Sequence, residues 1–461
     1  MSKVSFAQRG MWVTERLVGA GTAYNVPLAV RFGAGLDGGA LLKACAAVVD
    51  RHPVLSMTVR EVDGELELVP GEPVAIGGTE EPFDLDRGPL ARFTLDGRTL
   101  SFVAHHLVFD GHSKDVLVRD LAALYNGRTL PALEPAEDED FAALLPEAKA
   151  YWAEHWREPG ETVVHGSPLR VRRAGDALVT ELRADPQVPG LTRFETLIAA
   201  LHVLLAGYGT ADVVTAIDLS TRSPRDEDRI GVFVNELPIS SKPSPEQTFA
   251  EFGALVRERL REVYRFRAVP LAAAVPNLRP HAALTPVSVS YRARTGPDPV
   301  FDGVEAEVDW TVFNGGVRGS VHLQCVDGRD GLLVSVRHLP DVDGARLAVE
   351  LGELLAAVTA DPETRLGDLV TFSGPVIAEP AVARHQPRAT TEVEQVREIW
   401  QEVLGVSPIL DDDDIFDLGG HSLSITQIIA RMEKRLGLKV ELDDFFDHPT
   451  IAGVMGTASH D

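Results

Sequence analysis

Residues 100–111 have the sequence LSFVAHHLVFDG and run from a strand pattern into a turn. Apolar side chains alternate along the first half of this stretch, which predicts a β-strand, and Asp110 with Gly111 predicts the turn. Alternate residues of a strand share a face, so His105 and His106 are expected to point in opposite directions if the strand continues to His106. The two histidines are therefore not expected to act on one substrate or to bind one metal ion.

Two interpretations of this histidine pair are open from the residues alone. For an arbitrary pair followed by an aspartate, the simpler one is two core histidines and a turn aspartate. The functional one is a single general base at the end of a strand, with Asp110 holding the local geometry. Histidine suits this role because its reference pKa lies near neutral pH.

The rest of the body alternates between helical and strand patterns. Helical spacing of apolar residues predicts helices at residues 40–49, 116–125, 192–206 and 349–358. Strand patterns occur at residues 66–69, 213–217, 287–290, 321–325 and 332–336. Mixed elements over this length predict an α/β or α+β body of two lobes.

The composition excludes several classes of protein. The chain has 461 residues with a formal net charge of -25, which argues against a nucleic-acid partner. Its two cysteines, Cys45 and Cys325, cannot form a disulfide framework or a metal-site spacing and are expected to be buried thiols in a reducing cytosol. Apolar stretches are too short to span a bilayer, so we expect a soluble, cytoplasmic protein with no membrane partner.

The chain changes character after residue 372. Residues 373–390 contain three prolines and no periodic pattern, which predicts a linker before a last unit at 391–461. Residues 392–461 hold 15 acidic and 5 basic residues, so they carry -10 of the net charge. This charge fits a solvated acidic surface, but it also fits a domain that is attracted to basic patches on several partners.

Ser422 precedes a strong helical pattern in this last unit. Two glycines in residues 417–423 permit a tight turn, and the next apolar residues share one helix face: Ile425, Ile428, Ile429, Met432 and Leu436. A serine at this place is most simply an N-cap. The stretch is not the elbow motif of a serine nucleophile.

Two stretches of the last unit, residues 413–423 and 445–451, resemble the peptidyl carrier proteins of nonribosomal peptide synthetases. The resemblance implies a small all-α four-helix bundle. It also implies that Ser422 receives a covalent 4'-phosphopantetheine arm from a phosphopantetheinyl transferase, and that the arm's thiol holds an acyl group. The phosphate would then lie at a helix N-terminus, where the helix dipole favours an anion.

Residues 100–111 resemble the HHxxxDG signature of condensation domains and, more distantly, that of chloramphenicol acetyltransferase-like acyltransferases. Further stretches resemble condensation-domain motifs in the same order, the last of them weakly: residues 5–12, 51–55, 151–152, 230–235 and 269–271. The resemblance covers roughly residues 1–372. It implies an α/β fold of two chloramphenicol acetyltransferase-like lobes, at about 1–165 and 166–372, with a tunnel that meets at His106.

The resemblance also implies roles for individual residues. His106 would be the main catalytic residue, with His105 and Gly111 in the same motif, and the resemblance implies no metal. Asp110 would pair with Arg51 in a buried structural ion pair. The sequence departs from the family pattern at Ser56, where an arginine is usual, and after residue 270, where an arginine-rich motif is missing.

The predicted function is acyl transfer from an upstream carrier thioester to an amine acceptor, which forms an amide in nonribosomal peptide or hybrid polyketide biosynthesis. The expected partners are a donor carrier protein on another chain, a phosphopantetheinyl transferase and, since no adenylation domain separates the two units, a trans-acting adenylation enzyme. Three alternatives are open: ester formation with a hydroxyl acceptor, an acyltransferase that uses coenzyme A thioesters, and a non-catalytic platform that recruits enzymes to a carrier-bound substrate.

Overall fold

The computed structural model describes most of the chain, which forms two compact units. The described residues are 2–18, 21–62, 65–77, 82–133, 141–157, 159, 161–169, 174–276, 278, 283–294, 296–372, 390–404, 409–411, 413, 415, 422–441, 445 and 448–460. The second unit consists mainly of residues 377–461 and also includes the short segments 14–19 and 276–280. Of the predicted linker, residues 373–389 lie outside the described residues, and Thr390 already begins helix α10 (Thr390–Leu404).

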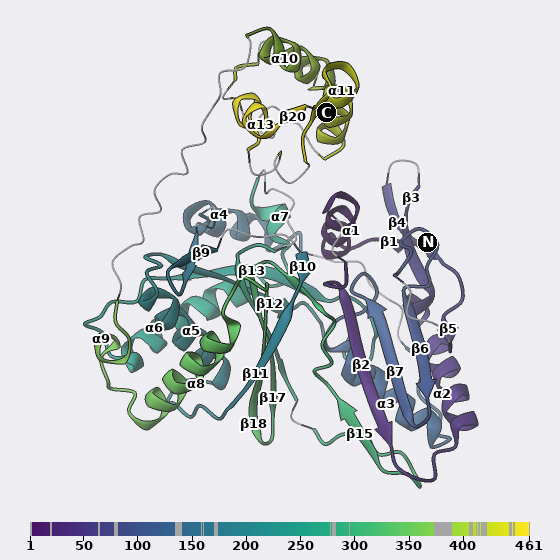
Figure 1. Ribbon diagram of the computed structural model, residues 1–461. Helices are drawn as coiled ribbons and strands as arrows, with labels where there is room; N and C mark the ends of the chain where they lie inside the picture. Colours follow the sequence, from purple (N-terminus) through teal and green to yellow (C-terminus); the bar gives the residue numbers. More distant parts are fainter. Residues whose placement is uncertain are drawn as a thin grey trace. The chain divides into compact units, whose positions relative to one another are not determined.

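The first half of the chain builds a five-stranded sheet around the histidine stretch (Figure 1). Its strands, in sheet order, are β15 (Ala306–Asp309), β2 (Asn25–Phe32), β7 (Thr99–His105), β6 (Ala91–Asp96) and β5 (Ala75–Ile76). Helices α2 (Gly38–Arg51) and α3 (Ser113–Tyr125) pack against this sheet in one hydrophobic core. Strand β7 is central and pairs with both β2 and β6, so the residues that follow it start from a rigid position.

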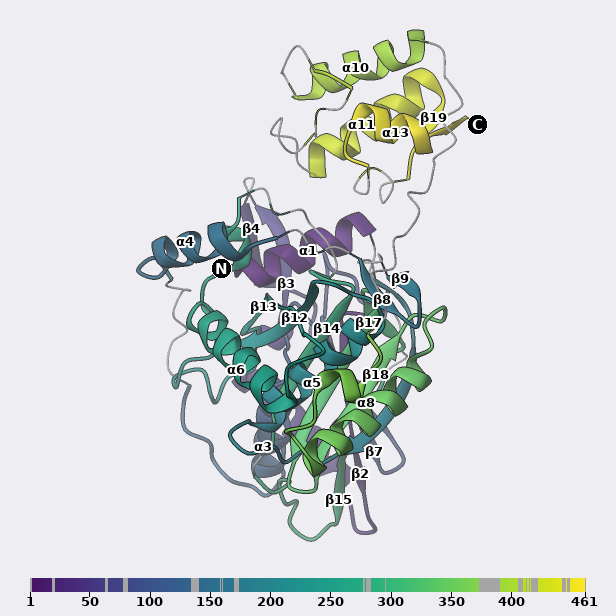
Figure 2. The same cartoon turned by 90° about the vertical axis from the view of Figure 1, so that its left-hand side faces the viewer.

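The second half of the chain builds a six-stranded mixed sheet. Its order is β11 (Leu178–Ala184), β18 (Gly331–His338), β17 (Val321–Gly328), β14 (Val287–Ala293), β12 (Val213–Ser220) and β13 (Val234–Ser241). The pairs β12–β14 and β14–β17 are parallel, and the other pairs are antiparallel. Figure 2 shows the helices in front of this sheet: α5 (Arg193–Gly207), α6 (Phe249–Arg265) and α8 (Gly344–Ala360).

The chain does not keep the two halves separate at the predicted border near residue 165. Strand β15 comes from the second half but pairs with β2, with Ala306 opposite Phe32. Ile230, Phe301 and Trp310 are also buried in the core of the first sheet. These excursions hold both halves together around the space between the two sheets.

Local sequence explains why the main elements form where they do. Helix α2 starts after Asp37, whose Oδ1 accepts a hydrogen bond from the Ala40 N–H at 2.9 Å. Helices α5 and α6 each start with a complete capping box, Thr192 with Glu195 and Thr248 with Glu251. The predicted helices and strands of the body therefore all appear, and their bounds extend the predicted ranges by a few residues.

Shorter elements complete the body. The strands are β1 (Ser2–Lys3), β3 (Met57–Val62) and β4 (Glu65–Pro70) in one small sheet, the pair β8 (Thr162–Val164) and β9 (Ser167–Leu169), and the pair β10 (Ala174–Asp176) and β16 (Gly316–Arg318). The helices are α1 (Phe6–Val18), the 3-10 helix η1 (Pro53–Ser56), α4 (Leu145–His155), α7 (Leu271–Ala274) and α9 (Leu366–Leu369).

The last unit has its own core. Its described elements are α10, α11 (Ser422–Leu436), β19 (Leu438–Lys439), α13 (Ile451–Thr457) and β20 (Ser459–His460). The predicted apolar face of α11 is confirmed, because Ile425, Ile428 and Met432 are fully buried. Trp400 and Phe445 stack with their ring centroids 5.3 Å apart.

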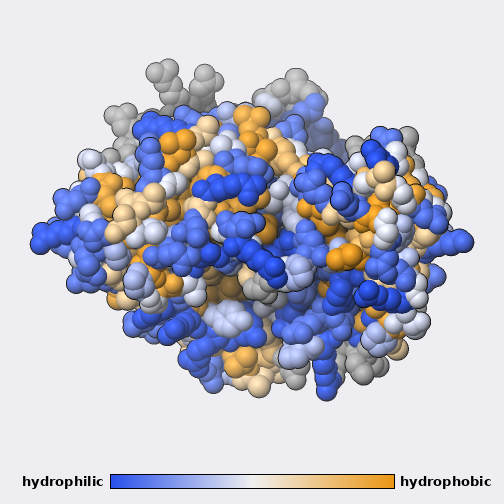
Figure 3. Space-filling model, turned by 90° about the horizontal axis from the view of Figure 1, so that it is seen from below, coloured by the Kyte–Doolittle hydropathy of each residue, from blue (hydrophilic) through white to orange (hydrophobic). Residues whose placement is uncertain are grey.

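Hydrophilic side chains dominate the surface shown in Figure 3, and hydrophobic ones form small scattered groups. Among the described helices, none combines the length and the low charge that a membrane span requires. Cys45 and Cys325 are free and buried, as predicted.

Candidate active site

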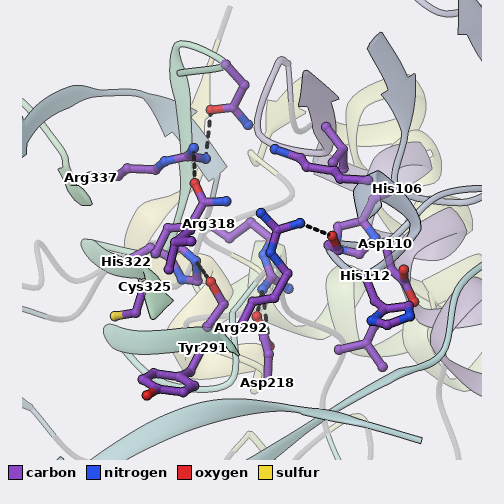
Figure 4. A pocket seen from close by; sticks show the side chains of 18 of the residues that line it. His106, Asp110, His112, Asp218, Tyr291, Arg292, Arg318, His322, Cys325 and Arg337 are labelled. Carbon is purple, nitrogen blue, oxygen red and sulfur yellow. Dashed lines mark hydrogen bonds and ion pairs between the residues drawn. The ribbon is translucent and has the colours of Figure 1, made fainter. Parts of the chain in front are cut away.

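A cavity of about 320 Å³ lies between the two sheets and includes His106 in its lining. In Figure 4, His106, Asp110 and His112 lie on one side of this cavity, and Tyr291, His322, Cys325 and Arg337 lie on the other. The first side is the turn between β7 and α3, and the second is made of β16 and of three strands of the six-stranded sheet, β14, β17 and β18. We call these two sides the histidine turn (residues 105–113) and the strand wall (residues of β14, β16, β17 and β18).

The end of strand β7 determines which histidine reaches the cavity. The strand ends at His105, and the His106 N–H donates to the Tyr24 carbonyl at 2.8 Å. His105 is only 3% exposed, and its Nδ1 accepts a hydrogen bond from the Leu107 N–H at 3.1 Å. The Leu107 carbonyl accepts a hydrogen bond from Gln8 Nε2 at 2.8 Å. These contacts direct His106 toward the cavity and keep His105 in the wall of the turn.

His106 is uncharged at neutral pH. Burial and the positive charge of Arg318 lower its pKa from 6.5 to about 4, and the charges of Asp110 and Asp218 offset only part of this effect. Its Nδ1 is buried and has no hydrogen-bond partner in another described residue. The ring therefore offers the cavity a neutral imidazole whose lone pair is available to accept a hydrogen bond.

Asp110 is buried in the histidine turn and accepts hydrogen bonds both from within the turn and from outside it. Burial opposes its ionisation, but the Arg222 guanidinium and the Ser113 hydrogen bonds more than offset this and lower its pKa below 3.8. Arg222 Nη2 donates to both carboxylate oxygens, at 2.8 and 3.0 Å, and the Phe233 N–H donates to Oδ2 at 3.0 Å. Asp110 is thus an ionised structural residue whose acceptors are all engaged.

The predicted ion pair between Asp110 and Arg51 is wrong. Arg51, at the end of α2, donates to Asp120 on α3 at 2.8 Å, while Asp110 pairs with Arg222. The reason is the packing of α2 against α3, which gives Arg51 a partner on the neighbouring helix. Asp110 instead faces the chain that leaves β12, where Arg222 lies two residues after the strand end.

The structure brings several of the motif stretches together around this turn, whereas Tyr151 and Trp152 lie in α4, where Tyr151 stacks on His155. The Gly231 N–H donates to Ser113 Oγ at 3.1 Å, so residues 230–235 dock on the start of α3. His52 accepts from the Ile230 N–H at 3.4 Å and contacts Asp120 at 2.9 Å, which attaches residues 51–55. Asn235 Nδ2 donates to the Val269 carbonyl at 2.7 Å, which attaches residues 269–271.

The strand wall carries charged groups that the sequence did not reveal. Arg318 Nη2 donates to Asp218 at 3.3 Å and lies 4.0 Å from Glu236. Burial and the Asp218 charge raise the pKa of Glu236 to about 7, although Arg318 acts in the opposite direction. Arg318 is thereby held near His106 and keeps the imidazole neutral.

Four functional candidates of the cavity region were missed from the sequence: Lys114, Arg222, Arg318 and Arg337. Arg222, Arg318 and Arg337 are far from the histidine motif in the sequence, and no spacing links them to it. Lys114 alone left a signal, since it is a lysine two residues before the apolar run Val116, Leu117 and Val118.

The other predicted site residues have simpler surroundings. Gly111 lines the cavity, and its carbonyl accepts from Arg292 Nη1 at 2.7 Å. Cys325 also lines it, but burial raises the pKa of this thiol, so it is not an activated nucleophile. Ser422 is the first residue of α11, and its side chain lies outside the described part of the structure. Among the described residues, no group of three or more His, Cys, Asp or Glu side chains is arranged to hold a metal ion.

Comparisons with known proteins match two separate parts of the chain to two families. The condensation-domain family matches residues 1–69 and 75–291, and the phosphopantetheine attachment site family matches residues 394–457. One component of the linear gramicidin synthase of Brevibacillus parabrevis is 30% identical over 61% of this chain, and tyrocidine synthase 3 of the same organism is 27% identical over 95%. The chain spans 7% and 8% of the lengths of these relatives.

Solved structures support the fold. The condensation domain of the monacolin K polyketide synthase MokA has a TM-score of 0.65 and 19% identity, covering 79% of this chain and 98% of its own. The first condensation domain of the calcium-dependent antibiotic synthetase, solved in complex with a substrate analogue, has a TM-score of 0.64 and 20% identity, covering 79% and 97%. The predicted fold class and the predicted resemblances to a condensation domain and a carrier domain are therefore confirmed.

Proposed function

The chain belongs to the condensation-domain family of acyltransferases and carries a phosphopantetheine attachment domain, and from this premise we propose that it forms an amide at His106 from a carrier-bound acyl thioester and an amine. The observation that carries the proposal is the neutral imidazole at the cavity between the two sheets. The similarity to synthetases of peptide products supports an amine as the acceptor.

His106 acts as a hydrogen-bond acceptor for the attacking amine. A general base works best when its pKa is near the operating pH. The His106 pKa of about 4 lies well below neutral pH, so the imidazole is a weak base. The low pKa favours orienting the amine lone pair toward the thioester over removing a proton in a separate step. Placing both reactants in one cavity supplies the larger share of the rate enhancement.

The reaction balances without a further reagent. The amine nitrogen attacks the thioester carbonyl, a C–N bond forms and the C–S bond breaks. The proton lost from nitrogen ends on the departing sulfur, which leaves as a thiol. In this step His106 contacts the reacting amine, and Asp110 with Arg222 positions the turn that holds His106. His105 and Gly111 shape the same turn.

Ser422 is the residue to which we assign the phosphopantetheine arm. It is the first residue of the fifteen-residue helix α11, so a phosphate on its hydroxyl would be attached at the positive end of the helix dipole. The arm supplies a thiol that holds an acyl group as a thioester. A phosphopantetheinyl transferase would attach the arm, and an adenylation activity outside residues 1–461 would load it. The donor acyl group would arrive on a second carrier protein.

The test is a condensation assay with the matured full chain and the variant His106→Ala. A donor thioester on a separate carrier is combined with an aminoacyl group or the matching hydroxyacyl group on Ser422, and the products on Ser422 are identified by intact mass. We expect amide product from the native chain and a rate about 10²-fold lower for H106A, because the amine loses the acceptor that orients it. The control is His155→Ala, which removes a histidine that stacks on Tyr151 in α4.

Three results would contradict parts of this proposal. An unchanged rate for H106A would defeat the catalytic role of His106 and favour a recruitment platform. Faster product formation with the hydroxyacyl acceptor would identify an ester-forming enzyme. Loading of Ser422 by amino acid and ATP without an added enzyme would show that the adenylation activity lies within the chain.

A further inference from the structure

The cavity beside His106 has an excess of positive charge. Its lining includes the cations Lys114, Arg292, Arg318 and Arg337 and the acids Asp110 and Asp218. Three ion pairs use both of these acids and one acid outside the lining: Asp110 with Arg222, Asp218 with Arg318, and Asp115 with Arg292. Two cations of the lining remain, Lys114 and Arg337, and neither lies within 4.0 Å of a carboxylate in the described residues.

Lys114 is the more deeply buried of the two. It is 1% exposed, and the hydrogen bond found for its Nζ within the described structure goes to the Trp310 carbonyl at 3.2 Å. The nearest acidic groups are engaged elsewhere, since Asp115 bonds Arg292 and Arg294, and Asp309 contacts Arg31 at 3.4 Å. A buried, charged lysine without a carboxylate is costly, and a carboxylate ligand in the cavity would offset this cost by stabilising the charged form.

Arg337 is 8% exposed, and its hydrogen bonds within the described residues go to neutral oxygens. Its guanidinium donates to Asn314 Oδ1 at 3.3 Å, to Gln324 Oε1 and to the Val312 carbonyl. Its Nε is buried and has no hydrogen-bond partner among the described residues. Asn314 and Gln324 orient the planar guanidinium without neutralising it, which is the arrangement expected for a group that binds an anion.

The two cations are close enough to repel each other. After burial, the charges of Arg292 and Arg337 are the main causes that lower the pKa of Lys114 well below its usual range. His322, next to them in the strand wall, is uncharged because burial and the charges of Arg318 and Arg337 lower its pKa. An anion placed between Lys114 and Arg337 would relieve the repulsion and satisfy donors of both side chains.

We propose that Lys114 and Arg337 bind a carboxylate carried by one of the two condensation substrates, so that this domain selects an acidic acyl donor or an acidic amine acceptor. The inference rests on the proposed function, because it names the substrate class of the same cavity. A volume of about 320 Å³ accommodates a short substrate chain beside His106.

The test measures binding rather than turnover, by calorimetry with the full chain. Each arm pairs a carboxylate probe with its neutral amide: glutaryl-pantetheine against its terminal amide for the donor, and 4-aminobutanoate against 4-aminobutanamide for the acceptor. We expect the carboxylate to bind about tenfold to a hundredfold more tightly than the amide in one arm, as for a hydrogen-bonded charged group. Lys114→Met and Arg337→Gln should each remove most of that preference. The matched control Lys242→Met, at a lysine whose side chain is 78% exposed, should keep it.

The outcomes separate this inference from the proposed function. Equal affinity for carboxylate and amide in both arms, or a preference that survives in both K114M and R337Q, would overturn the inference. Tighter binding of phosphopantetheine than of pantetheine, lost in the same variants, would overturn it by assigning the anion site to the arm phosphate. H106A should keep the carboxylate preference while it loses condensation activity, so failure of the function would leave this binding result standing.

Discussion

The histidine turn and the strand wall face each other across one cavity but are built in different ways. The turn is continuous in sequence, and hydrogen bonds within it join residues two or three positions apart, as from Leu107 to His105 and from Ser113 to Asp110. The wall takes residues from four strands, and Arg318 and Arg337 line one cavity because β16 and β18 are neighbours in space. The turn carries His106 in a motif that is continuous in sequence, while the wall supplies Arg337, one of the two groups that we propose bind a substrate carboxylate.

The histidine turn nevertheless depends on contacts with the second half of the chain. Its central carboxylate is satisfied by Arg222, which lies 112 residues away in the sequence. Residues 230–235 also dock on it through Ser113 and Phe233. The second half of the chain therefore stabilises the motif in the first half, and the following predictions test how strongly.

The largest expected effect is the loss of the buried ion pair in the variant Asp110→Ala. Asp110 and Arg222 side chains are each 6% exposed, and removing one partner leaves a buried, uncompensated charge. We expect the free energy of unfolding to fall by about 3–5 kcal/mol, measured by urea denaturation. D110A combined with Arg222→Met should cost clearly less than the sum of the single variants.

A second double-mutant cycle, with Arg51→Met in place of Arg222→Met, distinguishes the observed ion pair of Asp110 with Arg222 from the predicted pair with Arg51. Arg51 bonds Asp120 and not Asp110, so the effects of D110A and R51M should add within about 0.5 kcal/mol. Strong coupling of Asp110 to Arg51, or additivity with Arg222, would contradict the arrangement of the turn.

The next effect is the dependence of stability on pH through His106. Its pKa is about 4 in the folded chain, against an ordinary value of 6.5, so the unfolded chain binds the extra proton between these pH values. The stability contribution is present above pH 6.5 and decreases as the pH falls toward 4, by at most about 1.4 kcal/mol per pH unit. The pKa of Asp110 is lowered from 3.8, so the stability that its ionised carboxylate contributes is lost mainly at lower pH than the His106 contribution.

This prediction is checked by urea unfolding at several pH values between 7 and 4.5. H106A should show a smaller decrease of stability over this range than the native chain, because one titrating group is missing. Parallel curves for the two proteins would indicate that His106 titrates near its usual pKa. In that case the effect of Arg318 and burial would be absent.

The smallest effect is expected for Ser113→Ala, which removes a hydroxyl between the turn and Gly231. Ser113 Oγ accepts from the Gly231 N–H and lies 2.7 Å from Asp110 Oδ1. Loss of this buried contact should cost about 1–3 kcal/mol, below the cost of D110A. Unfolding midpoints of the two variants in urea test this order. A reversed order would show that the Ser113 hydroxyl stabilises the turn more than the Asp110 carboxylate does.

The local sequence pattern was sufficient to predict those helices and strands of the body that were expected from it. The alternation in residues 100–104 and the apolar spacing of α2, α5 and α11 depend on neighbours a few residues apart, so they are visible in one dimension. The same holds for the motif that carries His106 and for the helix start at Ser422. In the body, the pattern also made the two-lobed fold predictable once the motifs were recognised.

The sequence by itself predicted several helices and strands of the body, the difference between His106 and His105, and a carrier unit at the end of the chain. Only the tertiary structure decided the partner of Asp110, the path of β15 into the first sheet, and the gathering of Arg318, Arg337 and Lys114 around one cavity. Those contacts join residues far apart in the chain, and their energies depend on burial and on charges at short distance. Neither quantity is defined until the two sheets have packed against each other.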